Sequence, residues 1–179
     1  MTNANTIYYC FHPSPIGKLL LLVKNNALIG IEFEKEQHQI QATWQQSDTQ
    51  PVLLATKIAL DRYFNGEKEH FSDIPLAPQG TPFQQQVWQA LLAIPYGQFS
   101  SYGELAQQIG NPKAVRAVGG AVGRNPISII IPCHRILAKN SALTGFGGGL
   151  PAKRYLLQQE NIAYLDRGIE YVKEKQQRY

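Results

Sequence analysis

The segment Pro132-Cys133-His134-Arg135 places a thiol directly beside a histidine and an arginine. The thiolate is the nucleophilic form of cysteine, and an unperturbed thiol is only a few per cent ionised at pH 7, so activation requires a base or a positive charge nearby. His134 and Arg135 can supply either, although neighbours in an extended chain point to opposite faces, so His134 would reach the thiol through a turn or a bridging water. The segment predicts a reactive cysteine; the alternative is a buried structural cysteine, the usual environment of a free thiol.

The other cysteine, Cys10, lies inside an apolar stretch and is predicted to belong to the core. Two cysteines make no disulfide framework, so one or both should be free thiols. Cys10 together with His12, His38 and His70 would supply four ligands, but their spacing matches no zinc pattern. We therefore expect no metal site and no cofactor.

Basic residues are concentrated in the second half of the chain. The 179 residues carry 17 Lys+Arg and 13 Asp+Glu, but residues 1–80 have a net charge of −2 and residues 81–165 a net charge of +5. No acidic residue occurs between Glu104 and Glu160, where the basic residues are Lys113, Arg116, Arg124, Arg135, Lys139, Lys153 and Arg154. A surface of one sign favours a polyanion such as nucleic acid; the alternative is a solvated surface with no partner.

Apolar patterning predicts two domains that hold these residues in place. In the first, strands are expected at 7–11, 18–23 and 27–33, with Asn25-Asn26 as a two-residue type I′ turn, and a helix at 52–65 that ends before Gly66. The proline- and glycine-rich residues 66–82 predict a domain boundary, giving domains at 1–78 and 79–165 and a charged helix or tail at 166–179.

Helix signals follow closely in the second domain. Thr81 with Pro82 predicts one helix start, Ser101 with Glu104 predicts a capping box, and Asn111-Pro112 predicts the start of a third helix that runs to Val122. The last two helices, joined by a tight connection, are typical of a helix-turn-helix, which binds DNA or simply packs within its own protein. The apolar run Ile127–Ile131 predicts a buried strand that leads directly to Cys133.

The tetrad at 132–135, preceded by Arg116-Ala117-Val118-Gly119-Gly120 and by Asn125-Pro126, closely resembles the O6-alkylguanine-DNA alkyltransferases, also called methylated-DNA–protein-cysteine methyltransferases. The resemblance is dense from Phe83 to Ile162 and looser over the N-terminal strands. It implies a mixed α/β (α+β) fold, in which a small ribonuclease H-like domain of antiparallel sheet and helix precedes a mainly helical, winged-helix-like domain. The implied activity is repair of O6-alkylguanine, and of O4-alkylthymine, in double-stranded DNA by a monomer that flips the base and reacts once.

The resemblance also implies roles for individual residues. Cys133 corresponds to the cysteine that accepts the alkyl group irreversibly, and His134 to the histidine that withdraws the thiol proton through a water. Glu160 corresponds to the carboxylate that orients this histidine. Asn125 corresponds to the asparagine that ties the helix-turn-helix to the active-site strand, and Tyr102 to the tyrosine that contacts the DNA phosphate and donates a hydrogen bond to the base.

DNA contacts and a pocket wall are implied in the same way. Arg116 corresponds to a finger residue that enters the base stack, and the remaining implied DNA contacts are Ala117, Gly119, Gly120, Arg124 and Arg135. The glycines would allow close approach to the DNA backbone. Phe146, Gly147 and Gly148 would form a mobile wall of the pocket, with Phe146 standing where many members have a tyrosine.

Three other functions are alternatives to alkyl transfer. A helix-turn-helix regulator would need no Cys-His pair, a lesion-binding relative without repair activity has tryptophan in place of the cysteine, and a cysteine hydrolase would turn over. The N-terminal residues show no signal peptide and no membrane span, so the sequence predicts a cytoplasmic protein.

Overall fold

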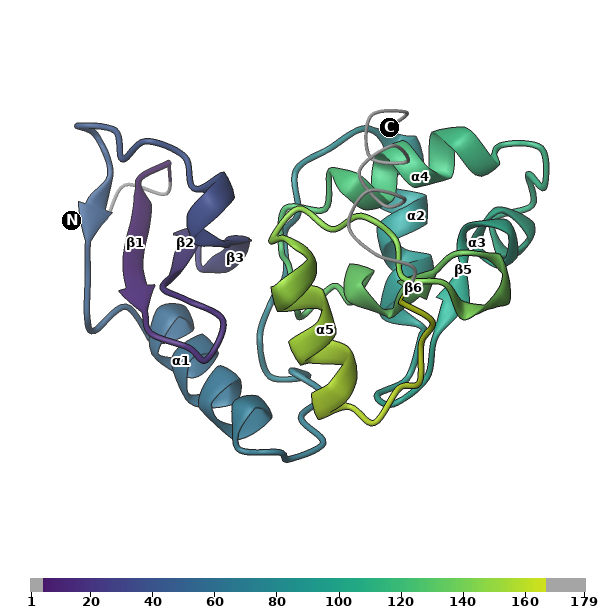
Figure 1. The fold of residues 1–179 in the computed structure, drawn as a ribbon. Coiled ribbons are helices and arrows are strands. Elements are labelled where there is room, and N and C mark those ends of the chain that lie inside the picture. Colours follow the sequence, from purple (N-terminus) through teal and green to yellow (C-terminus); the bar gives the residue numbers. More distant parts are fainter. Residues whose placement is uncertain (1–4, 167–179) are drawn as a thin grey trace. The chain divides into compact units, whose positions relative to one another are not determined.

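The computed structural model describes residues 5–166 and divides the chain into two compact units (Figure 1). The first unit comprises Met1–Gln79 and Pro126–Ile130, and the second comprises Gly80–Asn125 and Ile131–Tyr179. The charged tail expected at 166–179 lies outside the described residues except for Asp166. Within the described range, no helix is long and apolar enough to cross a membrane.

The first unit is built on a four-stranded sheet. Strands β1 (Ile7–His12), β2 (Leu19–Lys24) and β3 (Ala27–Glu32) pair antiparallel, and β4 (Gln45–Gln46) pairs parallel with β1, giving the order β3-β2-β1-β4. The short helix η1 (Glu34–Glu36) follows β3. Asn25 and Asn26 both have positive φ, 52° and 56°, as a type I′ turn requires, so the predicted hairpin is confirmed.

Helix α1 (Pro51–Phe64) packs against this sheet and matches the expected helix at 52–65 to within a residue. It begins at Gln50, whose side chain accepts hydrogen bonds from the backbone of Val52 and Leu53, and it ends before Gly66 at φ +89°. Cys10 is buried in β1, as predicted. The strands and the helix thus enclose an apolar core of their own.

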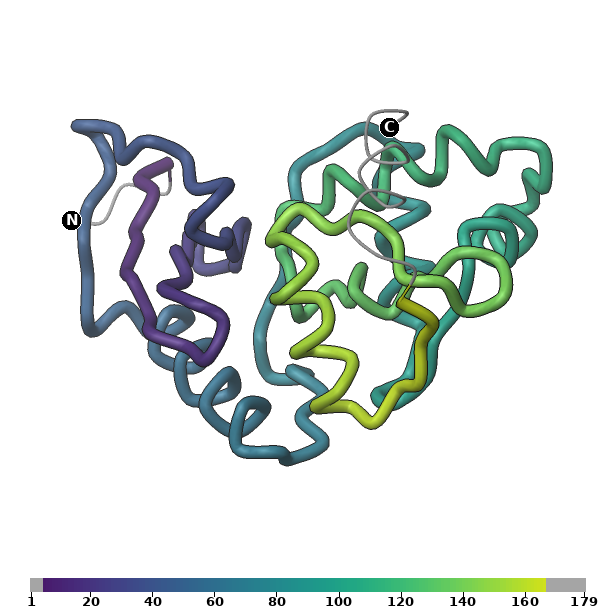
Figure 2. Tube along the Cα trace, in the orientation of Figure 1, coloured from purple at the N-terminus to yellow at the C-terminus, as the bar shows by residue number. Residues whose placement is uncertain are grey.

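The second unit is mainly helical, and Figure 2 follows its chain from teal to yellow. Its elements are α2 (Pro82–Leu92), β5 (Ser100–Ser101), α3 (Tyr102–Gln108), α4 (Val115–Gly123), η2 (Cys133–Arg135), β6 (Ile136–Leu137), η3 (Lys139–Ser141) and α5 (Leu150–Gln159). Strands β5 and β6 pair parallel, with Ser100 opposite Ile136 and Ser101 opposite Leu137. This pairing places the start of α3 beside the segment that follows Cys133.

The helix caps agree with the expected starts in part. Thr81 and Gln84 form a reciprocal capping box at α2. Ser101 accepts the Glu104 backbone N–H at the start of α3, but the Glu104 carboxylate accepts from the Ser100 hydroxyl, so only half of the predicted box is present.

The predicted cap at Asn111 is wrong, because α4 begins only at Val115 and its N-cap, Ala114, provides no side-chain hydrogen bond. The Asn111 carbonyl instead accepts from the Ala114 N–H and closes a turn around Pro112, whose fixed φ suits a turn as well as a first helical residue. Trp88 of α2 donates its indole N–H to the Ala121 carbonyl at 2.9 Å and so ties α2 to α4.

The predicted strand at Ile127–Ile131 is also wrong. Only Ile127 forms a bridge, to Ile31 of β3, and the chain then turns, with Ile129 at φ +74°. All five residues are buried, which explains the apolar run without a strand. An apolar run reports burial, and a short one does not distinguish a strand from a buried turn.

Candidate active site

The reactive segment is a single turn of 3-10 helix, η2, that contains Cys133, His134 and Arg135, all three buried. The Cys133 N–H donates to the Ile131 carbonyl, and the Arg135 N–H donates to the Pro132 carbonyl. Asn125 donates its side-chain N–H to the same Ile131 carbonyl at 2.7 Å, which joins the end of α4 to the residue two before the thiol. The turn geometry removes the extended arrangement in which His134 and Cys133 would point apart.

His134 is fully buried and bonded to Glu160, the residue that ends α5. Its Nε2 lies 2.6 Å from Glu160 Oε2. Burial lowers the pKa of His134, and the charges of Arg135 and Lys153 act in the same direction against the opposing effect of Glu160. The imidazole is therefore neutral at pH 7, Nε2–H donates to the carboxylate, and the lone pair is on Nδ1.

Nδ1 of His134 has no hydrogen-bond partner within residues 5–166. A neutral imidazole whose Nε2 is held by a carboxylate and whose Nδ1 is left as an acceptor is arranged to take a proton. The pair therefore has the geometry of a general base, close in sequence to a thiol that needs one.

Several groups of the second unit hold the Glu160 carboxylate in place. Besides His134, its Oε1 accepts from Arg135 Nε at 2.7 Å and from the Gly97 N–H at 3.1 Å. Burial alone would raise the pKa of Glu160, but the hydrogen bonds from His134 and Arg135 and the positive charge of Arg135 lower it to about 2. The carboxylate is thus ionised throughout the neutral range.

Arg135 does not lie at a DNA-binding surface, contrary to the sequence-based expectation. It is 7% exposed, donates to Glu160 and to the Ile94 carbonyl, both at 2.7 Å, and lies over the Tyr96 ring. A buried guanidinium needs a carboxylate and further acceptors, and these partners are provided here inside the protein.

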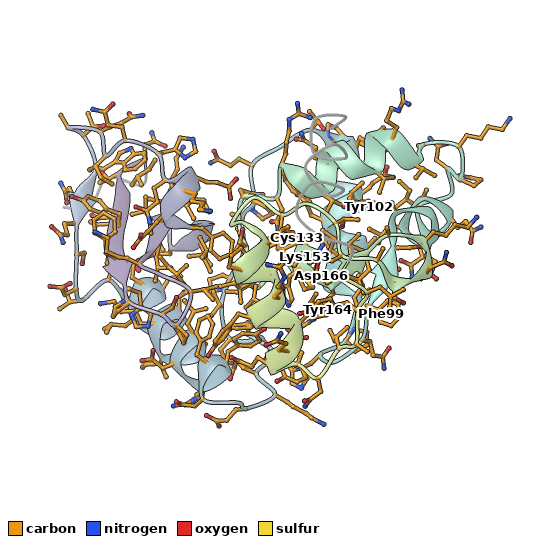
Figure 3. All side chains as sticks on the ribbon, viewed as in Figure 1. Phe99, Tyr102, Cys133, Lys153, Tyr164 and Asp166 are labelled. Atoms are coloured by element: carbon orange, nitrogen blue, oxygen red, sulfur yellow. The ribbon has the colours of Figure 1, made fainter. Side chains whose placement is uncertain are left out.

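Lys153 is a member of the site that the sequence analysis missed. It lies on the buried face of α5, two turns before Glu160, and is 1% exposed. Burial lowers its pKa to about 7, against the opposing charge of Cys133; Figure 3 labels Cys133 and Lys153 next to each other. Its place among the buried Ala152, Leu156 and Leu157 was the available signal, because helical spacing puts it on their face.

Tyr102 opens α3 and is half-buried. Its hydroxyl lies 3.3 Å from Thr144 Oγ1, and Thr144 in turn accepts from Lys153 Nζ at 3.0 Å. Tyr102 was expected from the resemblance; Thr144, which is 3% exposed, was not singled out. Phe146 is also buried, whereas Gly147 is exposed and Gly148 half-buried in the turn that leads to α5.

The outer face of α4 is basic. A groove of about 690 Å³ is lined by Thr81 and Gln84 at the start of α2 and by Lys113, Arg116, Ala117, Gly120 and Arg124. Arg116, Ala117 and Arg124 are exposed and Gly120 is half-buried, but Gly119 is buried with Val118 on the opposite face. The structure thus places Gly119 inside the protein, where it serves helix packing rather than a surface contact.

Three of the other basic residues of the acid-free stretch have partners in the protein: Arg135 and Lys153 are buried, and Arg154 Nε bonds to Asp166 at 2.7 Å, whereas Lys139 is exposed. The positive surface is therefore narrower than the sequence suggested and centres on the groove along α4. Among the described residues, no cluster of His, Cys, Asp and Glu side chains could hold a metal ion.

Comparison with known proteins identifies two family models along the chain. Residues 7–78 match the ribonuclease-like domain of the 6-O-methylguanine DNA methyltransferases, and residues 82–162 match their DNA binding domain. A Haemophilus influenzae methylated-DNA–protein-cysteine methyltransferase is 60% identical over 167 residues, which cover 93% of each chain.

Two crystal structures of related proteins resemble this chain in both sequence and fold. The Mycobacterium tuberculosis O6-methylguanine methyltransferase is 42% identical with a TM-score of 0.77, covering 87% of this chain and 93% of its own. The structure of the protein from that organism in complex with DNA is 43% identical with a TM-score of 0.78, covering 86% of this chain and 92% of its own. The mixed α/β architecture, an N-terminal sheet unit followed by a helical unit, is thereby confirmed.

Proposed function

The chain belongs to the 6-O-methylguanine DNA methyltransferase family, and on that premise we propose that it repairs DNA by moving the alkyl group of O6-alkylguanine onto Cys133. It acts as a methylated-DNA–protein-cysteine methyltransferase on double-stranded DNA, with O4-alkylthymine as a second substrate. The observation that carries this proposal is the buried His134–Glu160 pair. His134 directly follows Cys133 in the same helical turn, and its Nδ1 has no hydrogen-bond partner among the described residues.

Activation of the thiol follows from this geometry. The proton of Cys133 passes to Nδ1 of His134 through one water, and Glu160 stabilises the imidazolium that forms. A positive charge on Lys153 favours the thiolate further, since the two groups interact electrostatically. Sγ then attacks the alkyl carbon, the bond from that carbon to O6 breaks, and the electron pair remains on the base.

The product explains why the protein reacts once. Alkylation turns Cys133 into a thioether, and a thioether has no acyl carbon or other activated centre for water to attack. No second nucleophile in the described site is positioned to remove the group. Each molecule therefore repairs one lesion.

Delivery of the lesion requires extrusion of the base, which costs a few kcal/mol. The groove along α4 supplies phosphate contacts through Lys113 and Arg124, and Arg116 fills the place left in the base stack. Tyr102 binds next to the flipped nucleotide, Asn125 holds α4 against the reactive turn, and Phe146 packs at the pocket without a hydroxyl to offer the base.

Two alternatives fit the same structure less well. A helix-turn-helix regulator would use α4 but leave the buried Cys133–His134–Glu160 arrangement without a purpose. A lesion-binding protein without repair activity would not need a thiol next to a general base. We place the protein in the cytoplasm as a monomer; its two free cysteines suit a reducing compartment.

The test is intact-mass analysis after incubation with duplex DNA that contains O6-methylguanine. We expect one methyl group per protein, located on the peptide that contains Cys133, and no methylation of Cys133→Ala. Cys10→Ala is the matched control, because it removes the other buried thiol and should be methylated like the wild type. An unmodified wild-type protein after long incubation would overturn the proposal.

A further inference from the structure

We propose that Gly97 is a positioning residue for the reactive site: it forms a type II turn that aims its N–H at Glu160 and so holds the carboxylate in the orientation that His134 requires. This inference rests on the proposed alkyl transfer. Gly97 lies in the connection from α2 to β5, which passes next to the C-terminal end of α5 in Figure 1. Its backbone nitrogen is 3.1 Å from Glu160 Oε1.

One hydrogen bond and one backbone angle define the turn. The Gln98 N–H donates to the Pro95 carbonyl at 3.1 Å, which makes Tyr96 and Gly97 the central residues of a four-residue turn. Gly97 has φ +79°, whereas Tyr96 is not among the residues with positive φ, and this combination is that of a type II turn. Glycine adopts the required φ without a steric cost.

The type of turn decides where the Gly97 N–H points. This N–H belongs to the central peptide of the turn, and types I and II differ by a rotation of that peptide through roughly 150–170°. In the type II turn the N–H donates to Glu160. In a type I turn it would point away, and the carbonyl oxygen of Tyr96 would be directed at the carboxylate instead.

The bond from Gly97 fixes the orientation of the carboxylate. The Gly97 N–H and Arg135 Nε both donate to Oε1 of Glu160, and His134 bonds to Oε2. A planar peptide in a closed turn has little freedom, whereas an arginine side chain has several rotatable bonds. The turn therefore determines the direction of the His134 Nε2 bond, and with it the direction of Nδ1, the atom that takes the thiol proton.

The turn is anchored next to Glu160. The Tyr96 hydroxyl donates to the Gln159 carbonyl at 3.4 Å, and the Tyr96 ring lies over the Arg135 guanidinium, with 5.8 Å from the ring centroid to Cζ. Arg135 also donates to the Ile94 carbonyl, one residue before the turn. Burial and the charge of Glu160 raise the pKa of Tyr96 against the opposing charge of Arg135, so the hydroxyl keeps the proton that it donates.

Gly97 can be substituted without filling a packed site. It is exposed, and a Cβ there would meet only the Glu160 carbonyl oxygen, at 3.4 Å, apart from its chain neighbours and among the described residues. Valine is β-branched and avoids positive φ, whereas asparagine adopts it, so Gly97→Val favours a type I turn and Gly97→Asn keeps type II. Gly66→Val is the matched control, because Gly66 has φ +89° and open surroundings but lies in the first unit.

Two rates are measured at pH 7 in a Cys10→Ala background, which leaves Cys133 as the only thiol. One is single-turnover methyl transfer at saturating O6-methylguanine duplex, and the other is alkylation of Cys133 by iodoacetamide. We expect Gly97→Val to slow both about 10- to 100-fold, because a base displaced by a fraction of an ångström takes the proton poorly. Gly97→Asn should restore most of the loss, and Gly66→Val should leave both rates unchanged.

The affinity for the duplex should be the same in all of these variants, since Gly97 does not line the groove along α4. Three results would overturn the proposal: normal rates in Gly97→Val, equal slowing in Gly97→Asn, or a loss of methyl transfer with the iodoacetamide rate retained.

The pH profile of the iodoacetamide reaction distinguishes positioning from general damage to the fold. The other charged groups around the His134–Glu160 pair, Arg135 and Lys153, are the same in every variant. A displaced base needs a higher pH to give the same amount of thiolate, so the rising limb should move up by about one pH unit for each tenfold loss in rate. The rates should converge at high pH, where a thiol ionises without a base. A Gly97→Val protein that is equally slow at every pH contradicts the positioning role.

The same reaction separates this inference from the activity on which it rests. Iodoacetamide alkylation needs no DNA, so the Gly97 variants test the turn even if the wild type gains no methyl group, a result that refutes the alkyl transfer itself. A wild type that is methylated, together with a Gly97→Val protein that reacts at the normal rate, refutes only the role of the turn.

Discussion

Replacement of Arg135 by methionine tests whether this arginine works inside the protein or on DNA. The substitution keeps much of the aliphatic volume but leaves the carboxylate of Glu160 without its guanidinium partner and the Ile94 carbonyl without a donor. The matched control is Arg124→Met, which removes the same charge from an exposed position on the groove along α4. The two variants have identical net charge and differ only in where it was lost.

The magnitude follows from burial. Breaking a buried ion pair by removing one partner typically costs 3–5 kcal/mol. Glu160 keeps the bonds from His134 and the Gly97 N–H, so we expect the lower end, about 3 kcal/mol. For a chain of this size that corresponds to a fall in Tm of about 6–12 °C. Arg124→Met should change the free energy of unfolding by less than about 0.5 kcal/mol.

Two measurements decide the outcome: unfolding in denaturant, and DNA affinity as a function of salt. Each phosphate contact contributes about −0.9 to the slope of log K against log salt. Arg124→Met should reduce the slope by about one contact, whereas Arg135→Met should leave it unchanged. If Arg135→Met kept full stability and flattened the salt dependence, the buried assignment of this arginine would be wrong.

Two further predictions concern Glu160 and Arg116. The pKa of Glu160 is about 2 in the folded protein against 4.5 ordinarily, so its ionisation stabilises the fold above pH 4.5 and that stability is lost as the pH falls towards 2. Denaturant unfolding between pH 5 and pH 2.5 should show this loss in the wild type and a flatter profile in Glu160→Gln; parallel profiles would contradict it. Arg116→Ala should slow repair in duplex DNA far more than reaction with a free alkylguanine base, since only the duplex requires base extrusion, and equal losses would refute the finger role.

The features that the sequence predicted correctly depend on local chemistry. The hairpin at Asn25-Asn26 follows from the tolerance of asparagine for positive φ, and the start of α2 follows from Thr81 with Pro82. The reactive turn itself was found because its three residue types adjoin in the chain. In each case the residues that determine the structure lie within a few positions of one another, so they can be recognised in a single sequence.

The features that could not be predicted from the sequence depend on burial and on partners far along the chain. The sequence places Arg135 among the surface cations, because the carboxylate that pairs with it, Glu160, is 25 residues away. The sequence also places Lys153 among the basic surface residues, but it lies on the buried face of α5. The apolar composition of Ile127–Ile131 indicates that the segment is buried, and a buried strand is the usual structure of such a run. Composition gives no sign of the turn at Ile129, whose φ is positive.

Glu160 makes stability and chemistry inseparable at this site. The oxygen that accepts from Arg135 belongs to the same carboxylate that holds Nε2 of His134, and both bonds lower its pKa. A change at Glu160 therefore alters the orientation of the base and the free energy of unfolding together, and its effect on the rate cannot be assigned to either alone. Arg135→Met separates them, because it loosens the carboxylate without removing the bonds from His134 and the Gly97 N–H. A loss of stability with methyl transfer retained would show that Glu160 keeps its catalytic position without the guanidinium.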